Sequence, residues 1–167
     1  MSPRLGGHGS LISSATAGPV LPSSSVPEHN ALRNDMKLSL IMIVYGVTSL
    51  MHFAHNAIYL REYPHMPDWL TPAGVWAAFV ALTATGVLGY CVYRFRSRAV
   101  GVLLIAVYAL LGFAGLDHYV AAPVAAHSIV MNLTIAMEAA AAATLLFYLT
   151  RVSRSESRSD SRRYLPR

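Results

Sequence analysis

The segment LMHFAHNAIYL, residues 50–60, carries His52 and His55 in otherwise apolar surroundings, with Asn56 beside them. Positions i and i+3 of a helix share one face, so both imidazoles can be presented to a single point. Zinc, copper and iron sites use imidazole nitrogens in this way. The spacing alone matches no established ligand motif, but it predicts either chemistry or a buried polar partner in this segment.

Three further side chains that can bind metal flank a proline turn later in the chain. Asp117 and His118 precede Pro123, and His127 follows it. If the segments on both sides of the turn are helices of one bundle, we expect all these groups at a similar depth. The pattern then predicts a metal or haem site, with a transition metal or one haem b as cofactor and Asp117 as a ligand or as a group that orients one. The candidate metal ligands are His52, His55, Asp117, His118 and His127.

Two polar stripes at helical spacing suggest a second arrangement. The first consists of Tyr45, Ser49, His52, His55, Asn56 and Tyr59, and the second of His127, Met131, Thr134 and Glu138. In an antiparallel pair of helices, a rise of ~1.5 Å per residue brings Glu138 to the level of Tyr45. We therefore expect the stripes to face each other. In a metal-free acid/base enzyme, His52 and Glu138 would exchange protons, while Tyr45 and Asn56 would position the substrate.

Long uncharged runs contain most of these residues. Apart from histidine, no charged residue occurs in residues 38–60, 70–93 or 99–116, and residues 120–150 contain only Glu138. Each run approaches or exceeds the ~18–20 residues that cross a bilayer as a helix. We predict an all-α membrane protein, a four-transmembrane-helix antiparallel bundle with helices at residues 37–60, 70–94, 98–121 and 124–150. Tyr63, Trp69, Trp76 and Tyr119 fit an aromatic belt at one membrane surface.

The two ends of the chain differ from this domain in composition. Residues 1–35 are rich in Ser, Gly, Pro and Ala, and we expect them to be disordered. Residues 36–151 form the predicted transmembrane domain, and residues 152–167 form a basic, solvated cytoplasmic tail that we also expect to be disordered. Translation from Met36 would still include the whole domain. The apolar run after Met36 is long and lacks a clear cleavage site, so we expect an uncleaved helix rather than a signal peptide.

Basic residues are distributed very unequally. Of the 13 Lys and Arg residues, all except Arg61 flank the expected helices on the side of the two chain termini. Cytoplasmic loops carry such an excess, so we expect both termini in the cytoplasm and the protein in a bacterial plasma membrane. The net charge of +5 then faces anionic lipid headgroups, and no basic patch with interleaved aromatic residues suggests nucleic-acid binding.

Three functional hypotheses remain open from the sequence. The first is a redox-active metal or haem site toward the extracytoplasmic side. The second is a transporter or an accessory subunit, in which the polar column carries protons or ions or cements contacts to other membrane subunits or to a second copy. The third is an isomerase-type acid/base enzyme that acts on a lipid. The single cysteine, Cys91, rules out an internal disulfide and a thiolate metal cluster.

Overall fold

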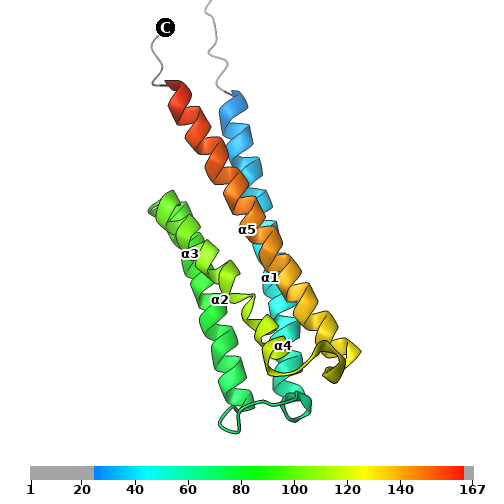
Figure 1. Ribbon diagram of the computed structural model, residues 1–167. Helices are drawn as coiled ribbons and strands as arrows, with labels where there is room; N and C mark the ends of the chain where they lie inside the picture. The colour runs from blue at the N-terminus through cyan, green and yellow to red at the C-terminus, as the bar shows by residue number, and fades with distance from the viewer. Residues whose placement is uncertain (1–24, 164–167) are drawn as a thin grey trace, which may run out of the picture.

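The computed structural model describes residues 25–163, with side chains for residues 32–154. This part of the chain contains helices and no strand. The α-helices are α1 (Ser25–Ile58), α2 (Pro72–Phe95), α3 (Arg98–Leu111), α4 (His118–Ala121) and α5 (Ile129–Arg163), and the single 3-10 turns are η1 (Leu60–Glu62), η2 (Ala114–Asp117) and η3 (Val124–Ala126). The long helices α1 and α5 lie side by side, next to the shorter pair α2 and α3 (Figure 1).

Four segments are long and apolar enough to cross a membrane: Leu32–Ile58, Pro72–Phe95, Arg98–Ala121 and Ile129–Arg154. Large hydrophobic side chains on them, such as Ile43, Val80 and Leu103, point outward and are exposed. Such a surface requires lipid around it, because a soluble bundle covers its outer faces with polar residues. The predicted fold class, an all-α bundle of four transmembrane helices, is confirmed.

The terminal helices are longer than the sequence predicted. Helix α1 begins at Ser25 rather than at residue 37, and α5 continues to Arg163 rather than ending at residue 150. Residues 25–35 and 152–163, for which we expected disorder, are therefore helical, because extending an existing helix adds one hydrogen bond per residue without a new nucleation cost. Residues 1–24 and 164–167 of the expected tails lie outside the described residues.

The third and fourth segments also differ from the prediction. Helix α3 ends at Leu111, and η2 and α4 complete a segment that was predicted as one helix. At this break Gly112 lies so close to Tyr45 that a Cβ would overlap the tyrosine ring and hydroxyl. After Pro123 the chain forms η3, and α5 begins only at Ile129, five residues later than expected.

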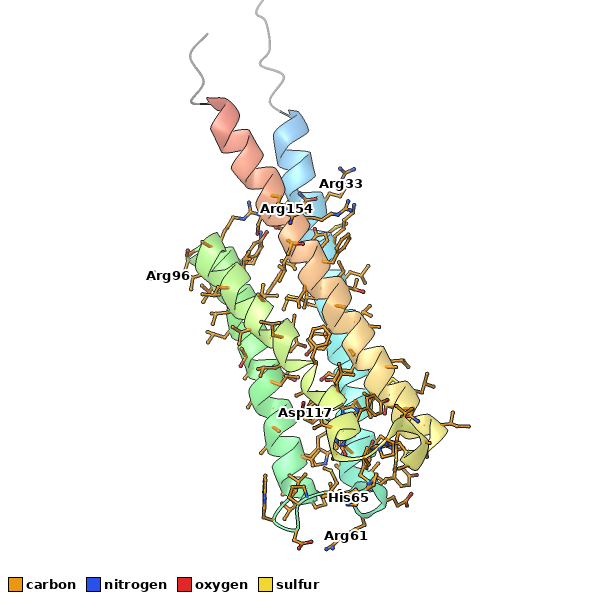
Figure 2. All side chains as sticks on the ribbon, in the orientation of Figure 1. Arg33, Arg61, His65, Arg96, Asp117 and Arg154 are labelled. Atoms are coloured by element: carbon orange, nitrogen blue, oxygen red, sulfur yellow. The ribbon has the colours of Figure 1, made fainter. Side chains whose placement is uncertain are left out.

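The two ends of the bundle have different polar features. We call the end with the described chain ends and the α2–α3 turn the terminal end, and the end with η1, α4 and η3 the loop end. Arg33, Arg96 and Arg154 lie toward the terminal end, while Arg61 and His65 lie at the loop end (Figure 2). An even number of spans requires this arrangement, because both chain ends must emerge on the same side.

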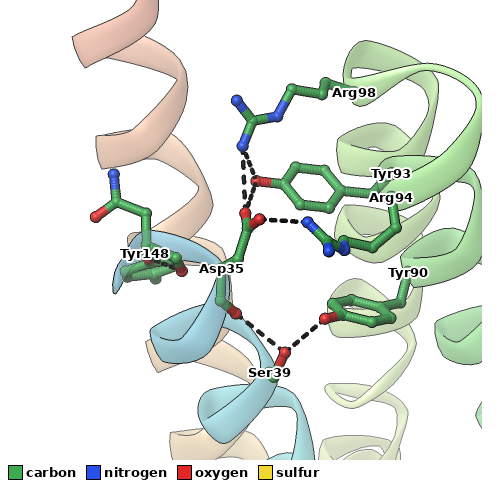
Figure 3. Close-up of polar contacts among 8 residues, drawn as sticks. Asp35, Ser39, Tyr90, Tyr93, Arg94, Arg98 and Tyr148 are labelled. Atoms are coloured by element: carbon green, nitrogen blue, oxygen red, sulfur yellow. Dashed lines mark hydrogen bonds and ion pairs between the residues drawn. The ribbon is translucent and has the colours of Figure 1, made fainter. Parts of the chain in front are cut away.

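An ion-pair network closes the bundle at the terminal end. Asp35 of α1 accepts hydrogen bonds from Arg94 at 2.6 Å, from Tyr93 at 2.9 Å and from Arg98 at 3.2 Å (Figure 3). The network holds α1 to the α2–α3 turn. Below it, a core of Tyr45, Ile105, Tyr108, Ala109, Ala142 and Leu145 fills the middle of the bundle.

Candidate functional site

A carboxyl group and an imidazole meet inside the bundle, between α1 and α5. His52 Nε2 lies 3.7 Å from Glu138 Oε2, and each residue is only 2% exposed. The hydroxyl of Ser49 donates a hydrogen bond of 2.6 Å to the other carboxyl oxygen, Glu138 Oε1. This short bond fixes the carboxyl group so that its second oxygen faces the imidazole. We call His52 and Glu138 the buried pair. Ser49 anchors the carboxyl group of this pair.

Three elements build this site. Ser49 and His52 are three positions apart on α1 and therefore share a face, while Glu138 lies on the adjacent helix α5. The backbone of η2 covers the pair, because a Cβ at Gly115 would lie 3.4 Å from His52 Nε2 and 3.5 Å from Glu138 Oε2. The break in the third segment thus brings η2 onto the site.

The contacts of Glu138 confirm that the two predicted polar stripes face each other, but they correct the register. Glu138 was expected at the level of Tyr45, whereas it contacts Ser49 and His52, one to two turns nearer the loop end. Instead, the hydroxyl of Tyr45 donates a hydrogen bond of 3.1 Å to the backbone oxygen of Tyr108. Tyr45 therefore belongs to the core next to the site and does not position a group at it.

A second polar cluster continues from the buried pair toward the loop end. The ring of His118 lies between those of His52 and His127, with centroid distances of 5.8 Å and 6.1 Å. Asn56 Nδ2 lies 3.2 Å from His118 Nε2, a geometry in which the amide donates to the ring nitrogen. The predicted residues Asn56, His118 and His127 are thus brought together with His52.

Several polar atoms of this cluster have no hydrogen-bond partner within the described residues. They are His52 Nδ1, Asn56 Oδ1 and His127 Nε2, all buried. The other nitrogen of His127, Nδ1, donates to the backbone oxygen of Pro123 at 3.1 Å. Buried polar atoms nearly always have a hydrogen-bond partner, so a buried polar atom without one indicates a position for water, an ion or a ligand.

Tyr63 is part of the cluster, although the sequence suggested only a membrane-surface tyrosine. It is 3% exposed, its hydroxyl lies 2.9 Å from His55 Nδ1, and its ring centroid is 4.8 Å from that of His118. Burial raises the pKa of Tyr63 to about 12, so at neutral pH the phenol is the donor to His55. Only the fold of the α1–α2 loop brings it inward, and no spacing pattern signals that.

The predicted shared metal site gains no support from this arrangement. Among the described residues, no group of three or more His, Cys, Asp or Glu side chains is disposed to hold a metal ion. His52 is directed to Glu138 and His55 to Tyr63, so the two histidines do not converge on one point. Asp117 is exposed, and its side chain has no hydrogen bond within the described part of the chain.

Four apolar spans around a buried His–Glu pair define a polytopic integral membrane protein with a carboxyl–imidazole pair in its interior. Comparisons of the sequence with protein-family models and with curated proteins, and of the fold with solved structures, found no match.

Proposed function

We propose that this membrane protein takes up and releases protons at the His52–Glu138 pair, as a transporter or as an accessory subunit of a proton-coupled membrane process. The observation that carries the proposal is the 3.7 Å separation of two groups that exchange protons readily, both buried between transmembrane helices. A lone charge in hydrocarbon is costly, so ionisable residues there generally pair and serve a functional role.

The chemistry of the pair suits proton exchange. A carboxyl group and an imidazole can share one proton and remain neutral overall, whichever of them holds it. The separation is slightly beyond hydrogen-bonding distance, so a small movement of either side chain makes or breaks the direct bond. Ser49 holds Glu138 in position, since its hydrogen bond of 2.6 Å leaves Oε2 toward His52.

A cluster of histidine and asparagine side chains leads from the pair toward the loop end. On that side lie His118, Asn56 and His127. Within the described residues, His52, Asn56 and His127 each have a buried polar atom without a hydrogen-bond partner. Toward the terminal end, the fully buried side chains of Tyr45, Ile105 and Leu145 fill the bundle. We therefore assign proton access to the loop end.

The distribution of basic residues supports an orientation. Among the described residues, Arg61 is the single Lys or Arg at the loop end, and in the sequence the other 12 of the 13 such residues lie before or near the start of the first span, around the α2–α3 turn, or near or beyond the end of the last span. By the positive-inside rule, the loop end faces the extracytoplasmic side of a bacterial plasma membrane, and the segments flanking the transmembrane domain are cytoplasmic. Protons then enter the site from outside.

An infrared titration of the protein in lipid bilayers tests the proposal. A protonated carboxyl in an apolar site gives its own absorption band, and this band should change with pH and disappear in Glu138→Gln. Glu62→Gln, which removes an exposed carboxyl at the loop end, is the matched control and should keep the band. A pH-insensitive band, or one that survives in Glu138→Gln, would disprove the proposal. So would a stoichiometric metal that is lost in His52→Ala, since that result favours a metal centre.

A further inference from the structure

A groove in the half of the bundle nearer the terminal end lies apart from the proton site. It has a volume of about 290 Å³ between α1, α2 and α3, and Gly46 and Gly86 form part of its wall. Ile43 and Val87 on its rim are 62% and 58% exposed, so the groove opens sideways toward the surrounding lipid. Its volume is close to the lower limit of small-molecule sites.

Two hydroxyl groups in this groove have no partner within the described residues. Thr83 Oγ1 is buried and makes no hydrogen bond, whereas Thr85, two residues further on, donates to the backbone oxygen of Ala81 at 2.9 Å. The hydroxyl of Tyr108 lies near Gly46, 3.6 Å from where a Cβ would be, and also makes no hydrogen bond within this part of the chain. An unsatisfied hydroxyl in a membrane interior is costly.

The depth of these hydroxyls decides which lipid could bond them. Thr83 is 11 residues from Pro72 and 12 from Phe95, the ends of its span. At a rise of ~1.5 Å per residue, it lies roughly 17 Å from either end, in the middle of the bilayer. Phospholipids have only hydrocarbon at this depth, because their ester and phosphate oxygens stay near the headgroups. A molecule that bonds Thr83 must bring its own oxygen to the bilayer centre.

We infer that the groove binds a neutral, lipid-soluble molecule that carries a carbonyl oxygen, of the ketone or quinone class. The hydroxyl of Tyr108 donates to the carbonyl oxygen, and a rotation of the Thr83 side chain turns its covered hydroxyl toward the same oxygen. The apolar wall holds the hydrocarbon body. A charged headgroup does not fit, because the groove is lined by no charged residue and the nearby Asp35, Arg94 and Arg98 bind one another at the terminal end.

Equilibrium binding of decylubiquinone to the protein in phosphatidylcholine nanodiscs tests the inference. The quinone should saturate at one molecule per protein, and decylbenzene, which has the same tail and no carbonyl, should not displace it. Thr83→Val and Tyr108→Phe should each weaken binding about tenfold, the effect of one hydrogen bond inside an apolar site. Thr85→Val removes a neighbouring hydroxyl outside the groove and should leave the affinity unchanged.

A space-filling variant provides an independent measurement. Gly46→Leu puts a side chain into the groove beside Tyr108 and should abolish binding while the protein remains folded, since a Cβ at this position meets only the Tyr108 hydroxyl, at an ordinary contact distance of 3.6 Å. Equal affinity of the wild type and both hydroxyl variants would overturn the inference, and so would equal binding of decylbenzene, which would mean that the groove holds any hydrocarbon chain. Glu138→Gln should not change quinone binding, so this test is separate from the proton-site test.

Discussion

His52 and His55 are three residues apart on one helix, yet they have different partners. His52 faces Glu138 on α5, while His55 lies against Tyr63 from the α1–α2 loop. A two-histidine metal site needs both nitrogens to reach one point, and here the loop tyrosine occupies the approach to the second ring. The two residues therefore act separately, the first at the buried pair and the second in holding the loop.

Replacing Tyr63 with Phe should weaken the loop. The change removes the hydroxyl 2.9 Å from His55 Nδ1, which should lower the free energy of unfolding by about 1 kcal/mol at neutral pH. Tyr59→Phe is the matched control, because the Tyr59 ring also packs on His55 while its hydroxyl makes no hydrogen bond within the described residues. Denaturant titration in mixed micelles measures both. An equal effect of the two changes would contradict the assignment.

The same residue predicts a pH dependence. The pKa of Tyr63 is raised from 10.0 to about 12 in the folded state, so the folded protein holds a proton that the unfolded chain releases first. The stabilisation from Tyr63 is therefore complete below pH 10 and is lost as the pH rises through about 12. Wild type should lose stability over this range more steeply than Tyr63→Phe. Parallel curves for the two proteins would show that the phenol is not shielded by the fold.

The break between the elements α3 and α4 shapes the proposed proton site. Gly112 allows the chain to pass directly over Tyr45, and η2 then covers His52 and Glu138 with Gly115. Gly112→Ala should destabilise the protein by about 1–3 kcal/mol, the usual cost of forcing extra volume into a packed interior. Gly74→Ala at the start of α2, where a Cβ comes no closer than 3.5 Å, should cost less than 1 kcal/mol. If the two changes had equal effects on thermal unfolding, the close approach at Gly112 would not matter.

The elements also show how far the sequence could predict the structure. The long uncharged runs predicted the four transmembrane spans, because the length and composition of a segment decide whether it can cross a bilayer. The break after Leu111 could not be predicted, since it depends on the contact of Gly112 with Tyr45 from another helix. His52 and Glu138 were found because polar residues are rare in apolar runs. Tyr63 was missed because it lies in a loop, where no periodicity shows which side chains turn inward.

For the molecule as a whole, the proposed proton access requires the loop end outside and the terminal end inside. In a variant without Cys91, Asp68→Cys at the loop end should react with a membrane-impermeant thiol reagent added to intact cells. Ser97→Cys in the α2–α3 turn should react only after the cells are opened. The reverse labelling pattern would invert the orientation and place proton access on the cytoplasmic side.

The most direct test of proton exchange with the loop side is a pH jump applied to one face at a time. In proteoliposomes with a single protein orientation, the infrared band of Glu138 is followed after acidification of either the loop side or the terminal side. We expect the band to change promptly when the loop side is acidified and to stay unchanged when the terminal side is acidified. In Glu138→Gln neither acidification should produce a change. A band that follows the terminal side, or neither side, would contradict the proposal.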